Sequence, residues 1–155
     1  MKGYEFRLQK VLDTCRLKEE LIEVKLAELE RLAESQRERL KSIEKEEEVL
    51  LSERRHLREK KGSVALEEEM FYENCLEALR LRIERMKMYL RQIEEQIRQT
   101  REELVAAAME RRVMEKLREK DYEHFRVEVE RNNQKALDEI AVQRFTRGEK
   151  PCSET

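Results

Sequence analysis

Apolar residues recur at heptad intervals along the first part of the chain. Such a series forms one edge of a coiled-coil seam. A second edge is less regular, because charged residues such as Lys18, Lys25 and Arg39 interrupt it. The pattern predicts one long amphipathic helix with an uneven seam. The heptad series consists of Leu8, Cys15, Ile22, Leu29, Gln36, Ile43, Leu50 and Leu57, in which Gln36 is the polar member.

A second and cleaner seam follows Gly62. Its apolar positions alternate in steps of three and four, which is the spacing of one helix face. We therefore predict an all-α chain with two long helices, at about 4–61 and about 64–147, joined by a turn at about 62–63. The second seam consists of Leu76, Leu79, Ile83, Met86, Leu90, Ile93, Ile97, Thr100, Leu104 and Ala107, in which Thr100 is polar.

The turn has signals of its own. Lys60 and Lys61 suit the negative end of a helix dipole, and Gly62 can adopt the left-handed conformation of a C-cap. Ser63 is a candidate N-cap for the second helix, and Glu67 to Glu69 would follow in its early turns. The sequence thus predicts a tight connection between two helices.

A short link between long helices favours an antiparallel coiled-coil hairpin. We predict a single domain over residues 1–147, with a flexible tail at 148–155. The two seams align best when Cys15 lies opposite Ala107 and Ile43 lies opposite Leu79. A slip of one heptad stays open, because seams of equal period tolerate it.

In this register the second helix overhangs the first by about twenty-five residues, or about 40 Å. The overhang keeps an apolar face, which includes Tyr122 and Ala136 and is interleaved with basic residues. An apolar face without an intrachain mate predicts a docking site for another protein, and self-association or fraying is the alternative. The predicted contact residues are Phe125, Arg126, Val129, Arg131, Leu137 and Ile140.

Composition and charge narrow the class of protein. Ala, Glu, Lys, Leu and Arg make up well over half of the chain, as in long helices and coiled coils. The 34 basic and 36 acidic residues are interleaved, so no basic face for nucleic acid stands out. No apolar run is long enough for a membrane span or a signal peptide. We expect a cytoplasmic protein that is a monomer when free.

Residues that carry chemistry are few. Cys15, Cys75 and Cys152 share no metal-binding spacing, and we interpret them as two packing thiols and one thiol in the tail. His56 and His124 lack a second ligand nearby. No phosphate loop or nucleophile motif occurs. We predict no enzymatic activity, no metal and no cofactor.

Two features allow more than one interpretation. Gln36 and Thr100 interrupt the seams, and they could fix the register or simply make the seam uneven. Phe71 and Tyr72 follow the turn, and they could cap the end of the core or form an exposed aromatic contact.

The order and spacing of several stretches resemble the flagellar export protein FliJ family over most of the chain. Tyr4 to Leu12 (YEFRLQKVL), the series Tyr72, Leu76, Leu79 and Ile83, and the late stretch from Met114 to Lys120, followed by Leu137 to Ala141, carry the resemblance. None of these motifs is specific by itself.

The resemblance implies a soluble part of the flagellar type III export apparatus. Proteins of that family look like the two-helix stalk of rotary ATPases. They insert into the export ATPase ring and promote its assembly, contact the cytoplasmic domain of the export gate, and help to recycle substrate chaperones. The family pattern for the gate contact matches Tyr72 and Leu76, and Phe71 lies beside them. The alternatives are a stalk of a virulence secretion system and a generic cytosolic coiled-coil scaffold.

Overall fold

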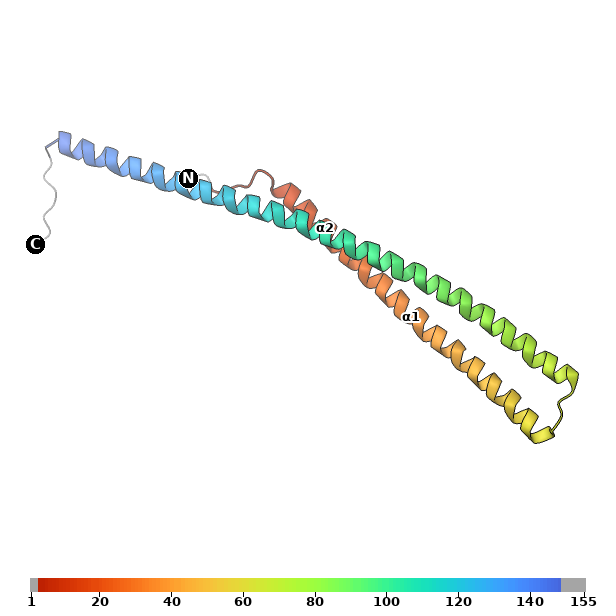
Figure 1. Ribbon diagram of the computed structural model, residues 1–155. Coiled ribbons are helices and arrows are strands. Elements are labelled where there is room, and N and C mark those ends of the chain that lie inside the picture. Colours follow the sequence, from red (N-terminus) through yellow and green to blue (C-terminus); the bar gives the residue numbers. More distant parts are fainter. Residues whose placement is uncertain (1–2, 149–155) are drawn as a thin grey trace, which may run out of the picture. The chain divides into compact units, whose positions relative to one another are not determined.

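The computed structural model describes residues 3–148, and two helices dominate this part of the chain (Figure 1). Helix α1 spans Gln9–Lys61 and helix α2 spans Leu66–Thr146. The two helices pack against each other, which confirms the all-α fold class with two long helices. The predicted tail lies outside the described residues except for Gly148.

Both helices begin later than predicted. Before α1, the backbone turns, because Gln9 N–H donates to the carbonyl of Phe6 at 3.0 Å and Val11 N–H donates to that of Leu8 at 3.0 Å. Phe6 is only 7% exposed, so this turn is anchored by its side chain. The aromatic residues of the N-terminal stretch therefore belong to an irregular segment and not to the helix.

The structure divides into two compact units, which α1 and α2 both traverse. One unit comprises residues 19–106 and contains the turn. The other pairs the N-terminal residues through Lys18 with the part of α2 from Ala107 onward. Each unit is described separately.

In the unit of residues 19–106, the two helices run antiparallel because the turn reverses the chain (Figure 1). The core is a single row of seam residues, in which Ala33 packs with Ile93 and Ile97. Leu26, Leu29 and Leu90 flank this cluster and are half-buried. The heptad prediction therefore identified the buried face. Further seam residues that are buried in this unit are Ile43, Leu76, Ile83 and Thr100.

The predicted register was wrong by one heptad. It would have placed Ala33 near position 89, but Ala33 packs with Ile93 and Ile97. It would have placed Arg37 near position 85, but Arg37 pairs with Glu94 at 3.1 Å. The connection is longer than predicted, since α1 ends at Lys61 and α2 begins at Leu66. The structure adopts the neighbouring heptad register, in which each partner on α2 lies about seven residues closer to the C-terminus.

The turn itself confirms part of the sequence reasoning. Gly62 has a φ of 67°, in the left-handed region, while nothing lies within 4 Å of the place where a Cβ would stand. Conformation and not crowding therefore selects glycine here. Basic residues occupy the last turn of α1 and Glu67 to Glu69 the first turn of α2, as the helix dipole favours.

Ser63 is not the N-cap of α2, which corrects the prediction. The carbonyl of Ala65 accepts the first hydrogen bond of the helix, from Glu69 N–H at 3.1 Å. The residue that gives the first accepting carbonyl is the N-cap, so alanine occupies this position. Ser63 lies farther back in the turn.

The polar seam residue Thr100 does not join the two helices. Its side chain is 2% exposed, and its hydroxyl donates to the carbonyl of Gln96 in its own helix at 2.8 Å. Because this bond stays within α2, it satisfies the buried hydroxyl without specifying a partner on α1.

The second unit has a shorter seam. Leu12 is completely buried and Ala107 is 1% exposed. Two interhelical ion pairs border this seam, Arg16 with Glu115 at 3.4 Å and Lys18 with Glu110 at 2.9 Å. Cys15 precedes both pairs along α1 and is half-buried, which agrees with a packing thiol. Cys152 lies outside the described residues.

Candidate interaction surfaces

Tyr4 joins the N-terminal segment to α2. Its ring lies edge-on to Tyr122, with 5.1 Å between centroids, and is tilted against Phe125 at 5.4 Å. Its hydroxyl lies 3.2 Å from the carbonyl of Arg118 and 3.2 Å from a carboxylate oxygen of Asp121. Loss of water around the phenol raises the pKa of Tyr4, and the hydrogen bond to Asp121 raises it further.

This contact corrects the predicted start of the overhang. Tyr122 and Phe125 were expected to lack an intrachain mate, but both rings pack on Tyr4. The one-heptad difference in register explains the error, because it brings the N-terminal segment farther along α2. Phe125 and Val129 are half-buried, and every described residue after Val129 is exposed. The free end of α2 is therefore the part from 130 to Thr146.

The free end of α2 carries large apolar side chains in water (blue in Figure 1). Leu137 is 61% exposed and Ile140 is 47% exposed, as the docking prediction requires. Phe145, at 86%, is the most exposed of the large apolar residues and was missed by the sequence reasoning. Its signal was its spacing of eight residues from Leu137, which puts the two side chains about 80° apart within one broad apolar face.

The two predicted basic contacts of this surface differ in their surroundings. Arg126 forms an ion pair with Glu123 of its own helix at 3.3 Å. Arg131 is exposed on the free end. Exposed ion pairs contribute little to stability, so Arg126 can exchange Glu123 for a partner at small cost.

The other predicted surface lies next to the turn. Phe71 is 62% exposed, and its ring lies edge-on to that of half-buried Tyr72 at 5.9 Å. Leu66 and Met70 are 75% and 56% exposed and lie one helical turn apart, so they extend this apolar group. The sequence reasoning missed both. We call Leu66, Met70 and Phe71 the turn patch.

Leu76, the third predicted gate contact, is completely buried in the seam. A side chain that is closed off by its own helices cannot contact a partner unless the helices move. This position argues against Leu76 as a surface contact. The family pattern and the seam pattern coincide at this residue, and the structure follows the seam.

A cluster of ion pairs joins the two helices beside the turn patch. Arg54 is 18% exposed and forms ion pairs with Glu69 and, at 3.0 Å, with Glu73. Arg58 forms an ion pair with the same Glu69. These bonds tie the last turns of α1 to the first turns of α2, from which Phe71 projects.

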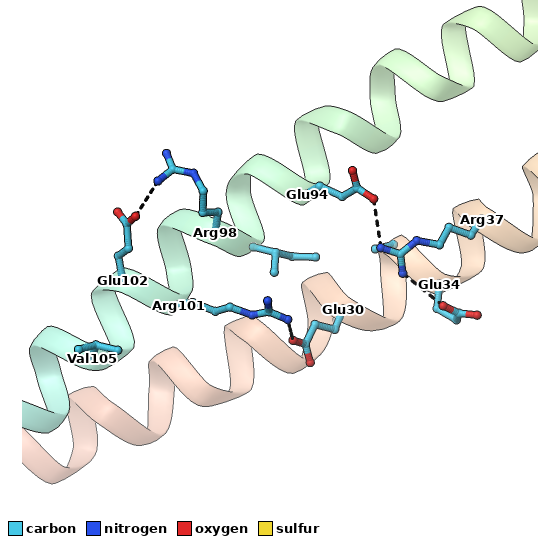
Figure 2. Close-up of a pocket in the computed structure, with 10 residues that line it drawn as sticks. Glu30, Glu34, Arg37, Glu94, Arg98, Arg101, Glu102 and Val105 are labelled. Carbon is cyan, nitrogen blue, oxygen red and sulfur yellow. Dashed lines mark hydrogen bonds and ion pairs between the residues drawn. The ribbon is translucent and has the colours of Figure 1, made fainter.

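A concavity of about 770 Å³ in the same unit is lined mainly by charged side chains (Figure 2). Arg101 pairs with Glu30 at 2.8 Å, and Arg37 pairs with both Glu34 and Glu94. The hydrogen bonds to Glu94 and Glu34 raise the pKa of Arg37. The charges neutralise one another, so this concavity stabilises the helix pair and offers no unpaired group to a ligand.

The same holds for Arg98 at the rim of this concavity. Its guanidinium lies 2.6 Å from Glu95 and 2.6 Å from Glu102 (Figure 2 labels Arg98 and Glu102). These bonds raise the pKa of Arg98, and the hydrogen bond from Arg98 lowers that of Glu95. Within residues 3–148, no group of acidic, histidine or cysteine side chains has the arrangement of a metal site.

No helix in the described part of the chain is both long and apolar enough to cross a bilayer.

The fold and these surfaces define a class of protein, namely a two-helix coiled coil whose candidate sites are exposed faces for other proteins. The comparison with protein families identifies the particular family. The model described as "Flagellar FliJ protein" matches residues 4–150, so the chain belongs to the FliJ family. This family is a non-catalytic component of the flagellar export apparatus. No curated protein and no solved structure matches the chain significantly.

Proposed function

We propose that this protein is the stalk-like coiled coil of the flagellar type III export apparatus, binds the export ATPase ring and promotes its assembly. In this proposal, the protein also links the ring to the export gate and to substrate chaperones. It acts in the cytoplasm and is recruited to the cytoplasmic face of the inner membrane at the flagellar base. The observation that carries the proposal is the free end of α2, together with membership of the FliJ family.

The free end supports insertion into a ring for a physical reason. Leu137, Ile140 and Phe145 are exposed and lie within a few turns of one another on a helix that has no partner in this section. Burial of such side chains in a protein channel removes apolar area from water. The basic residues Arg126 and Arg131, with Phe125 and Val129 at the base, complete the predicted contact.

The turn patch supports a second contact, next to the connection between α1 and α2. We assign the cytoplasmic domain of the export gate to Phe71 and Tyr72, since exposed aromatic side chains are frequent anchors of interfaces. Leu76 has no direct contact in this proposal because it is buried. Two separate surfaces allow one chain to bind two partners at once.

The test of the ring contact is the ATP hydrolysis rate of the purified export ATPase from the same genome. We expect the protein to stimulate the rate and to increase the share of hexamers. The variant Leu137→Ala/Ile140→Ala should need about tenfold more protein for half-maximal stimulation. The matched control, Leu21→Ala/Val24→Ala, changes side chains that are 62% and 57% exposed elsewhere on the chain. Equal loss in both variants, or no stimulation at saturation, contradicts the proposal.

The gate contact is tested separately by calorimetry with the purified cytoplasmic domain of the gate protein. Phe71→Ala should weaken binding, whereas Met88→Ala, at a side chain that is 60% exposed, should leave it unchanged. Binding that survives Phe71→Ala and Tyr72→Ala together would remove the turn patch from the proposal without affecting the ring contact.

A further inference from the structure

One long edge of the helix pair in residues 19–106 is closed by ion pairs. Along this edge, Glu30 pairs with Arg101 at 2.8 Å, Arg37 with Glu94 at 3.1 Å and Glu44 with Lys87 at 3.2 Å. The three residues of α1 follow one another at heptad intervals, so the pairs form a regular ladder. Every charge of this ladder is therefore paired within the protein.

The opposite edge starts a similar ladder but does not continue it. Lys25 pairs with Glu103 at 3.6 Å. Heptad steps from this pair place Leu32 opposite Gln96, Arg39 opposite Tyr89, and Glu46 opposite Arg82. Within the part of the chain that the structure describes, none of these three positions forms an ion pair across the helices. Over two heptads this edge is therefore left without interhelical charge compensation.

A surface depression of about 480 Å³ lies at the interruption. Its floor comes from the seam: Ile43 is 5% exposed, and Met86 and the polar seam residue Gln36 are half-buried. Polar and charged side chains form the rim. The depression gives Gln36 a place at a solvated edge, where an amide costs less than in a closed seam. The lining residues are Gln36, Arg39, Ser42, Ile43, Glu46, Arg82 and Met86.

The charges around the depression are mainly positive. Arg39, Arg82 and Arg85 have no acidic partner at ion-pair distance among residues 3–148, and all three are exposed. Arg85 lies one turn from Arg82 on the same side of α2. Glu46 is the one acidic residue that lines the depression. The edge thus carries excess positive charge, although the chain as a whole has a net charge of −2.

Apolar and aromatic side chains accompany these arginines. Tyr89 is 45% exposed and Leu32 is 38% exposed. Arginine and tyrosine are enriched in the cores of protein interfaces, where acids and lysines are depleted. We call Leu32, Arg39, Arg82, Arg85 and Tyr89, with the depression between them, the Arg39 edge.

We propose that the Arg39 edge is a docking site for an acidic amphipathic helix of a partner protein. The partner helix lies along the edge as a third helix of the coiled coil and places an apolar side chain in the depression. Its carboxylates pair with Arg39, Arg82 and Arg85. Charge complementarity favours this occupant, since two acids of the chain's own run beside the turn are already paired: Glu68 with Lys61, and Glu69 with Arg54. The inference does not depend on the proposed function.

The experiment uses the full chain and a fluorescein-labelled helical peptide with leucines at i, i+3, i+4 and i+7 and glutamates on both flanks. Fluorescence anisotropy measures its dissociation constant. We expect saturable binding that weakens about tenfold in Arg39→Gln/Arg82→Gln/Arg85→Gln, because each rim ion pair contributes modestly. The control Arg55→Gln/Arg91→Gln/Arg112→Gln changes three exposed arginines outside the edge by the same charge. It should alter binding by less than about twofold.

Two further probes separate this occupant from others. The same peptide with glutamine in place of glutamate should bind at least about tenfold more weakly, and higher salt should weaken the acidic peptide. A lysine version of the peptide, or duplex DNA, that binds as tightly through the same arginines overturns the proposal. Equal loss in the control variant, or no saturable binding of the acidic peptide, also overturns it. Unchanged unfolding curves of both triple variants would establish that the binding changes are local.

Discussion

At Leu76 the seam pattern predicts a buried residue and the family pattern predicts a partner contact, so a substitution there tests the two roles against each other. Its side chain is completely buried, although the family pattern places it at a partner contact. Leu76→Ala removes three carbon atoms, each worth about 0.8 kcal/mol when buried. A helix pair is open on both flanks and can partly close the cavity, so the cost should stay at the lower end of the usual range. We expect a loss of about 2 to 3 kcal/mol in the free energy of unfolding.

Urea unfolding followed by far-ultraviolet circular dichroism measures this loss. For a slope of about 2 kcal/mol per molar urea, the midpoint should fall by about 1 to 1.5 M. The control is Leu66→Ala, which makes the same chemical change at a side chain that is 75% exposed and should cost less than about 0.5 kcal/mol. Equal midpoints for the two variants would refute the burial of Leu76. Binding of the gate domain by folded Leu76→Ala should remain, since the side chain contacts only its own helices in this structure.

Three further outcomes test other parts of the structure. Thr100→Val should stabilise the protein by about 1 kcal/mol in urea unfolding, because a buried hydroxyl that bonds only within its own helix is replaced by a methyl group. Tyr4→Ala should speed hydrogen exchange in the segment before α1, whereas Tyr4→Phe, which keeps both ring contacts, should change it much less. In a background with Cys75 and Cys152 replaced by serine, Cys15 should form a disulfide with Met114→Cys but not with Ala107→Cys. The second site is about 10 Å away along the helix, and a disulfide there would support the register first predicted.

The sequence was sufficient for the fold class and for most of the buried face. Heptad spacing identified Ile43, Ile83 and Ile93 as seam residues, and all three are buried. Gly62 was assigned to the left-handed position it occupies. These features are local or strictly periodic, so one chain carries enough information to predict them.

The register could not be obtained from periodicity, because a slip of seven residues places apolar residues opposite apolar residues again. Interhelical ion pairs such as Arg37 with Glu94 report which alternative the structure adopts. Because every pair follows from the register, the slip of one heptad changed every predicted pair and the predicted start of the overhang.

The candidate sites were predictable only in part. Leu137 and Ile140 were found because the helix pattern continues where the first helix has ended. The packing of Tyr4 on Phe125 joins an irregular segment to a helix, and no periodic signal announces such a contact. The predicted domain organisation and the partner contacts stay predictions, since geometry alone does not test them.

The surfaces proposed for partners share one property, which is that contacts between the two helices do not use their residues. A seam residue such as Leu76 follows the heptad repeat and is buried between the helices. A charged residue such as Arg37 belongs to the ladder and is paired with Glu94 of the other helix. Phe145 lies where α2 has no partner helix, and Arg39 lies where the ion pairs of its edge stop, so both are exposed in water. In a two-helix protein, the residues free to bind others are therefore those for which the opposite helix supplies no partner, and the places where the pairing of the helices stops are the places at which function should be sought.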